Sequence, residues 1–169
     1  VPEIYEEIIE IRNIAREAGS RSKVAVYSND ENLDVKGACI GRNGMRIQNI
    51  IDELCGEKID IVLWNEDITE FVKNALNPAE VLSVEIIEEG EENMKVARVL
   101  VAENQLSLAI GKKGQNSRLA ARLCGVKIDI HTEPAEIDEF EEYEEDTAFN
   151  DSFEDEVEES AFAGLHEKD

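Results

Sequence analysis

The chain has 169 residues, enough for one ordinary domain or two small ones, and its 40 acidic and 17 basic residues give a formal net charge of −23. This charge disfavours loose, sequence-independent binding to DNA or to anionic lipid, both of which attract basic proteins. The charge is uneven, because residues 134–169 hold 16 of the acids and one base, a net charge of −15, and leave residues 1–133 at −8.

The N-terminal part of the chain predicts a helix and then a strand. Pro2 suits the first turn of a helix. Apolar residues at helical spacing extend the pattern to about Ala18, and they are Ile4, Ile8, Ile11 and Ala15. Residues 23–28 then predict a strand.

One motif occurs twice further along the chain. Residues 40–64 and 110–132 share Ile-Gly-x-x-Gly at an offset of 70 and Leu-Cys-Gly-x-Lys-Ile-Asp-Ile at an offset of 69. Each copy predicts a brief helix before the glycines, a second helix that another glycine ends, and a buried strand. The predicted elements are 35–40, 47–54 and 58–63 in the first copy, and 105–110, 115–124 and 126–131 in the second. The repeat indicates two copies of one small fold.

The segment between the copies completes the second unit. Residues 67–76 predict a helix that ends before Pro78, and residues 81–88 and 94–102 predict a hairpin. The predicted fold class is α/β (α+β), with one unit at 1–65 and another at 66–133, each a small sheet packed on helices. Almost no linker separates the units, so we expect a rigid tandem.

The C-terminal residues 134–169 combine dense acidic charge with few aliphatic side chains, which cannot offset the entropy lost on ordering. We therefore expect a disordered acidic tail. Such a tail either competes with nucleic-acid phosphates for nearby basic loops, as a tethered polyanion, or only keeps the protein in solution.

The two Gly-x-x-Gly segments form the candidate functional site. Glycine lacks a Cβ, so a sugar-phosphate backbone can approach the main chain, and the following helix directs free N–H groups at the loop. This arrangement is typical of a KH module, whose loop binds the backbone of four nucleotides. The predicted contacts to single-stranded RNA are Gly41, Arg42, Asn43, Gly44, Arg46, Gly111, Lys112, Lys113, Gly114, Arg118 and Arg122. The alternative is that these glycines only serve tight helix–helix turns.

Patterns for other chemistries are missing from the sequence. Neither segment has the Gly-x4-Gly-Lys-Ser/Thr spacing of a nucleotide-hydrolysing loop. Cys39, Cys55 and Cys124 form no Cys-x-x-Cys pair, no histidine completes a zinc site, and no catalytic constellation is visible. We therefore expect no enzyme activity, metal or cofactor. The cysteines indicate a reducing, cytoplasmic setting, and the apolar stretches are too short for a membrane span.

Residues 1–133 resemble the NusA family of bacterial transcription factors. The segments that carry the resemblance are Gly-Ser-Arg-Ser-Lys-Val-Ala-Val at 19–26, Gly-Ala-Cys-Ile-Gly at 37–41, Lys-Ile-Asp-Ile-Val-Leu-Trp at 58–64 and Ala-Ile-Gly-Lys-Lys-Gly-Gln-Asn at 109–116. The resemblance implies two tandem prokaryotic-type KH domains and adds Gln115 and Asn116 to the RNA contacts. One departure is Val35 and Lys36, where the family has proline and an apolar residue, so the start of that helix is open.

The resemblance also implies a biological role. Members act on RNA polymerase during elongation, pausing, termination and antitermination. The implied partners are the nascent single-stranded transcript and, through the full-length protein, RNA polymerase and other elongation or antitermination factors, with the chain as a monomer. A start at Val1 suggests a piece of a longer protein. Two rivals stay open: a protein-interaction scaffold with degenerate KH units, and an RNA-processing enzyme whose catalytic domain lies elsewhere.

Overall fold

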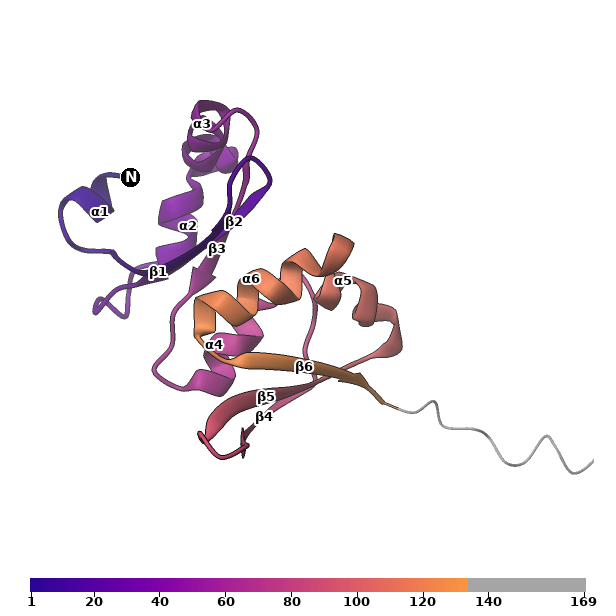
Figure 1. Cartoon of the computed structure of the whole chain (residues 1–169). Helices are drawn as coiled ribbons and strands as arrows, with labels where there is room; N and C mark the ends of the chain where they lie inside the picture. The colour runs from indigo at the N-terminus through magenta and orange to yellow at the C-terminus, as the bar shows by residue number, and fades with distance from the viewer. Residues whose placement is uncertain (134–169) are drawn as a thin grey trace, which may run out of the picture. The chain divides into compact units, whose positions relative to one another are not determined.

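The computed structural model describes residues 1–133, so the predicted disorder of the acidic tail at 134–169 lies outside the described residues. The described chain repeats one order of helices and strands (Figure 1). The first set is α1 (Pro2–Tyr5), β1 (Glu10–Glu17), β2 (Arg21–Tyr27), α2 (Val35–Ile40), α3 (Met45–Glu53) and β3 (Lys58–Leu63). The second set is α4 (Ile68–Ala75), β4 (Ser83–Glu89), β5 (Met94–Val101), α5 (Leu106–Ile110), α6 (Gln115–Cys124) and β6 (Lys127–Thr132).

Each set builds a three-stranded mixed sheet. In the first sheet β1 pairs antiparallel with β2 and β2 pairs parallel with β3, and β4, β5 and β6 repeat this pattern in the second. Parallel neighbours need a crossover connection. In both sheets the crossover is a pair of helices, and the Gly-x-x-Gly loop joins them. The predicted α/β fold of two similar units, each a sheet packed on helices, is confirmed.

The helix predicted for residues 2–18 is wrong beyond Tyr5. Glu7 has a φ of 60°, which interrupts the helix, and the chain then runs as β1 along β2. The helical pattern placed Ile11 on the buried face, yet Ile11 is 46% exposed and its neighbour Ile9 is 1% exposed. Branched isoleucines suit an extended chain, and pairing with β2 outweighs the local helical spacing.

The start of α2, left open by the sequence, is set by a side-chain cap. The carboxylate of Asp34 accepts a hydrogen bond of 3.0 Å from the backbone N–H of Gly37. An aspartate at this position stabilises the first turn of a helix. The valine and lysine that replace the family's usual residues therefore do not prevent the helix from forming.

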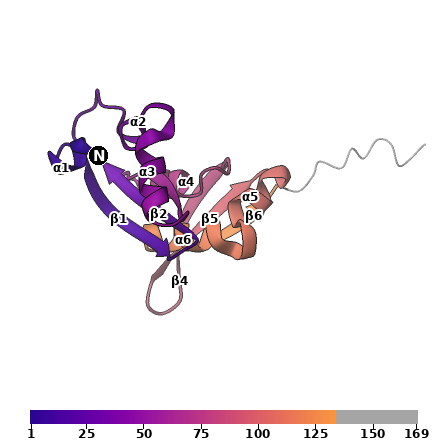
Figure 2. The same ribbon diagram turned by 90° about the horizontal axis from the view of Figure 1, so that it is seen from above.

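The two sheets share one hydrophobic core. Its buried residues come from both sets of elements, with Ala15, Ala25 and Val62 from the first and Val72, Leu76, Leu119 and Leu123 from the second. Helix α6 lies beside β1 and β2 of the first sheet in both views (Figures 1 and 2), while the β4–β5 turn projects away from it. Because α6 starts at the second glycine loop, this packing ties that loop to the first sheet.

Polar contacts reinforce the same junction. Lys23 is fully buried, and its Nζ donates to Asp60 Oδ2 at 3.0 Å and to the carbonyl oxygen of Asn77 at 3.2 Å. Burial lowers the pKa of Lys23, while the Asp60 carboxylate opposes that shift. Asn13 Nδ2 donates to the Leu123 carbonyl at 2.7 Å. Among the helices of residues 1–133, none is long and apolar enough to cross a bilayer.

Candidate nucleic-acid interface

The two Gly-x-x-Gly loops have nearly the same backbone conformation. The first glycine has φ and ψ of 79° and 173° at Gly41 and of 76° and 172° at Gly111. The third residue has 54° and 27° at Asn43 and 55° and 27° at Lys113. Although the middle residues are Arg-Asn in one loop and Lys-Lys in the other, both loops present their backbone groups in the same way.

The two glycines of each loop have different tasks. A Cβ on Gly111 would lie 2.7 Å from Asn116 Cβ and 2.8 Å from its backbone nitrogen, so this glycine lets the chain pass close to α6. A Cβ on Gly114 would meet only Arg118 Nη1, at 3.8 Å, and one on Gly44 would meet no atom within 4 Å. The second glycine therefore leaves open space in front of the helix that it precedes.

That open space faces helix ends that have no side-chain cap. Gly44 and Gly114 are the N-cap residues of α3 and α6, and neither helix has a side-chain hydrogen bond at its N-cap. The backbone N–H groups of Met45 and Gln115 donate to the carbonyl oxygens of Arg42 and Lys112, and the N–H groups that follow in the first turn of each helix carry partial positive charge. Each loop therefore offers donors and positive potential to an anion.

The middle residues of both loops project into solvent. Arg42, Asn43, Lys112 and Lys113 are exposed. Within residues 1–133 none of these side chains has an ion pair or a side-chain hydrogen bond. Their charged groups are therefore accessible to a ligand at the loop.

Arg46 and Asn116 stand at equivalent positions after the loops and both brace the helix before the loop. Arg46 Nη1 donates to the Ala38 carbonyl and to Glu3 Oε2, each at 2.8 Å. Asn116 is 4% exposed. Its Nδ2 donates to three carbonyl oxygens, those of Leu76 at 3.0 Å, Leu108 at 3.2 Å and Ala109 at 3.0 Å. These side chains hold the loop in shape, a role that sequence reasoning missed.

Three other predicted residues converge on a carboxylate of the first sheet, Glu17. Arg118 Nε and Gln115 Nε2 both donate to it, the latter at 2.8 Å, and Arg122 Nη1 lies 4.0 Å from it. The hydrogen bonds from Arg118 and then Gln115 lower the pKa of Glu17 to about 2. Gln115 Nε2 also donates to Ser20 Oγ at 2.6 Å. The turn between β1 and β2 is thus bound to the start of α6.

The buried carboxylate of Glu57 stabilises the turn between β1 and β2 through hydrogen bonds. It is 1% exposed and accepts hydrogen bonds from the Arg16 guanidinium, from the Gly19 backbone N–H at 2.8 Å and from Ser22 Oγ at 2.8 Å. Arg16 first, and then Gly19 and Ser22, lower the pKa of Glu57. Sequence reasoning missed Glu57, although a signal was present: it is the variable residue of Leu-Cys-Gly-x-Lys-Ile-Asp-Ile, and Val126 occupies the position in the second copy.

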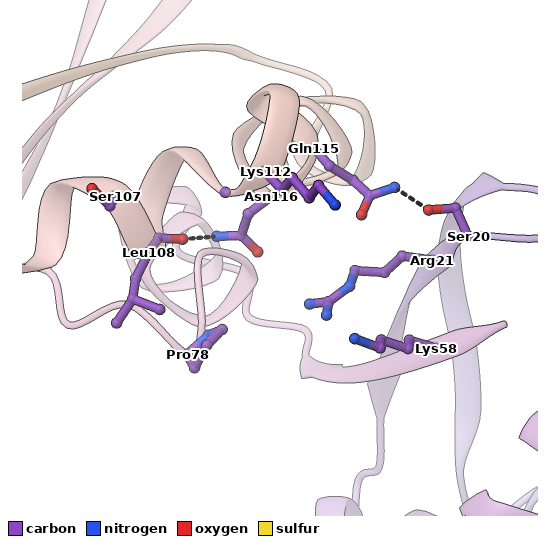
Figure 3. A pocket seen from close by; sticks show the side chains of 10 residues that line it. Ser20, Arg21, Lys58, Pro78, Ser107, Leu108, Lys112, Gln115 and Asn116 are labelled. Carbon is purple, nitrogen blue, oxygen red and sulfur yellow. Dashed lines mark hydrogen bonds between the residues drawn. The ribbon is translucent and has the colours of Figure 1, made fainter. Parts of the chain in front are cut away.

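A cavity of about 400 Å³ lies between the first sheet and the second loop (Figure 3). Its lining contains three cations, Arg21, Lys58 and Lys112, and no carboxylate. The other lining residues are Ser20, Pro78, Ser107, Leu108, Gly111, Gln115 and Asn116. The positive edge of the second loop therefore continues onto the first sheet. No group of three or more His, Cys, Asp or Glu residues that could hold a metal ion occurs within 1–133.

Comparisons with known proteins agree with this architecture. Residues 1–64 match the NusA-like first KH domain, and residues 68–138 match the NusA-like second KH domain. The crystal structure of APE1850 is similar, with a TM-score of 0.57 and 25% sequence identity over 76% of this chain and 94% of that one.

Relatives named "Transcription termination/antitermination protein NusA" are similar in sequence. The protein of Bacillus subtilis is 55% identical over 133 residues, or 79% of this chain and 35% of that protein. The protein of Thermus thermophilus is 55% identical over 142 residues, or 84% and 35%. The protein of Borreliella burgdorferi is 48% identical over 166 residues, or 96% and 34%.

The chain spans about a third of the length of these curated relatives. The two domain matches together cover most of it and fall on the two structural repeats, each of which carries one glycine loop. The matched family consists of transcription factors with KH domains and not of enzymes. The chain therefore belongs to the NusA family and carries its two KH domains.

Proposed function

We propose that this chain binds single-stranded RNA across its two Gly-x-x-Gly loops. In the full-length protein, this binding serves a factor that acts on RNA polymerase in elongation, pausing, termination and antitermination. The RNA is the nascent transcript, and the chain works as a monomer in the cytoplasm. The two binding units are residues 1–65 and 66–133. The observation that carries the proposal is the pair of loops with matching backbone, an open second glycine and exposed middle side chains.

Phosphate binding follows from the groups that each loop presents. The uncapped N-termini of α3 and α6 offer N–H donors, and Arg42, Lys112 and Lys113 add full positive charge. A KH loop holds the backbone of four nucleotides, so two loops hold about eight. Backbone contacts position the strand, while base contacts select its sequence.

We divide the proposed site residues into two groups, a division that their intramolecular contacts support. The four glycines, Arg42, Asn43, Lys112 and Lys113 contact the RNA backbone. Arg46 and Asn116 shape the loops, and Gln115, Arg118 and Arg122 fasten α6 to the first sheet through Glu17. Both Gly-x-x-Gly loops have the same backbone conformation, which argues against a scaffold with degenerate KH units.

The test is a double charge reversal in the second loop, Lys112→Asp with Lys113→Asp. We expect weaker binding to single-stranded RNA of every sequence, because phosphate contacts carry no sequence information. The slope of log affinity against log salt should flatten by about 1.4, since each phosphate contact on a single strand contributes about 0.7. Fluorescence anisotropy at several salt concentrations measures both effects.

The control carries the same change of charge away from the loop. Lys95→Asp with Lys127→Asp alters β5 and the start of β6, next to the end of α6 that lies farthest from the loop. We expect a smaller loss of affinity and an unchanged salt slope. Unaltered RNA affinity in the loop variant, with its circular dichroism spectrum intact, would refute the proposed function.

A further inference from the structure

The cavity beside the second loop contains a buried acceptor that lacks a partner. Asn116 lines the cavity and is 4% exposed, and its Nδ2 already serves three carbonyl oxygens. Its Oδ1 is buried and accepts no hydrogen bond from any residue in 1–133. Figure 3 shows this oxygen on the side of the amide that faces Arg21 and Lys58, across the cavity. A buried acceptor without a partner is costly, and a donor from a ligand in the cavity would satisfy it.

The cavity has an apolar side and a cationic side. Pro78 and Leu108 lie on one side of Asn116 in Figure 3, and the Lys112, Arg21 and Lys58 side chains lie on the other. Leu108 is 47% exposed, so its apolar surface is available. Lys58 and Lys112 are exposed and form no ion pair within 1–133, whereas Arg21 is bound to Asp60 at 3.1 Å. Only two of the three cations therefore need an external anion.

This arrangement fits one nucleotide of a single strand. A volume of about 400 Å³ lies within the range of small-ligand cavities, roughly 300–1,000 Å³. Leu108 and Pro78 offer an apolar surface for a base, Asn116 Oδ1 offers an acceptor for an amino group of that base, and Lys58 and Lys112 offer positive charge to its phosphate. Gly111 and Lys112 belong to both the loop and the cavity lining, so a strand that leaves the loop enters the cavity directly.

We propose that the cavity is a nucleotide subsite at which the two KH domains together read one base that bears an exocyclic amino group. The inference rests on the proposed RNA binding and adds selectivity that neither loop provides alone. The Asn116 side chain is held rigid by its three donor contacts, so Oδ1 is a fixed acceptor. Adenine N6, cytosine N4 and guanine N2 carry such an amino donor, and uracil has none.

The test combines a protein variant with modified RNA. Of the two cavity cations that form no ion pair within 1–133, Lys58→Gln removes the one that lies outside the glycine loop. Lys127→Gln is the matched control, since Lys127 is the first residue of the equivalent strand in the second repeat and does not line the cavity. We expect Lys58→Gln to weaken binding of a ten-nucleotide RNA by about fivefold to tenfold, the effect of one charged hydrogen bond. Lys127→Gln should change it by less than about twofold.

Modified RNA locates the subsite along the strand. A neutral methylphosphonate is placed at each linkage in turn, and one position should weaken binding to the wild-type chain more than to Lys58→Gln, in which only the Lys112 contact remains to be lost. At the neighbouring nucleotide, purine riboside in place of adenosine, which removes only the amino group, should weaken wild-type binding by about fivefold.

The outcomes separate the two proposals. If the wild-type chain binds no RNA, the proposed function fails and the subsite with it. If it binds RNA but Lys58→Gln and Lys127→Gln behave alike, the subsite is wrong and the proposed function stands. If removal of the amino group weakens RNA binding at no position of the strand, the subsite is also wrong.

Discussion

Replacing the first or the second glycine of a loop by alanine should differ in its consequences for stability and for RNA binding. Gly111→Ala places a Cβ 2.7 Å from Asn116 Cβ and 2.8 Å from its backbone nitrogen, at φ and ψ of 76° and 172°. Gly114→Ala places a Cβ in open space, at φ and ψ of 73° and 13°. We expect the first variant to lose more stability and the second to lose more RNA affinity.

The magnitudes follow from the two backbone regions and from the close contact. The conformation of Gly111 is nearly exclusive to glycine and costs another residue about 1–3 kcal/mol, and overpacking adds about 1–3 kcal/mol. Gly114 adopts the left-handed helical region, which costs an alanine about 1–2 kcal/mol. Alanine also reduces the entropy of the unfolded chain, which stabilises the folded state of both variants by about 0.4–1 kcal/mol. The net losses are about 3 kcal/mol for Gly111→Ala and about 1 kcal/mol for Gly114→Ala.

Urea denaturation measures this difference. With a slope of about 2 kcal/mol per M, the midpoint should fall by about 1.5 M for Gly111→Ala and by about 0.5 M for Gly114→Ala. RNA affinity, measured where both variants are folded, should fall more for Gly114→Ala, because its methyl group occupies the space in front of α6. Equal midpoints for the two variants would refute the division of tasks between the glycines.

Two further predictions concern the junction between the domains. The pKa values of Glu17 and Glu57 lie below the ordinary value of 4.5, so the folded state resists protonation of both carboxylates. Their contribution to stability is therefore complete above about pH 4.5 and decreases as the pH falls below this value. Glu57→Gln should therefore flatten the dependence of the unfolding midpoint on pH between about 5 and about 3, and an unchanged pH profile would contradict this. Because one core joins the two domains, NMR relaxation should give a single tumbling time for residues 1–133. The Glu17→Gln variant should also show a single tumbling time. Two independent tumbling times would contradict the shared core.

The sequence alone was enough to find the parts of the fold whose signal is local. The glycine spacing, the apolar positions before Gly125 and the strands that begin at Lys58 and Lys127 all lie within short segments, and two copies confirm each other. Helices and turns are largely encoded by neighbouring residues, which is why α3, α6 and both loops were predicted correctly. The N-terminal strand β1 was missed because its isoleucines fit a helical spacing as well as a strand, and its partner β2 decides between them.

Only the tertiary structure shows which other parts of the chain the predicted site residues contact. Gln115 and Arg118 were expected to contact RNA, and in the structure they donate to Glu17, 98 and 101 residues away. Asn116 was expected in the helix after the loop as an RNA contact, and it is buried, donates to carbonyl oxygens of the chain and has an acceptor that faces a cavity also lined by Lys58 of the other domain. Contacts between distant residues leave no periodicity in the chain, because they depend on how two folded surfaces meet. The loops could therefore be read from the sequence, while the junction that joins them required the packed structure.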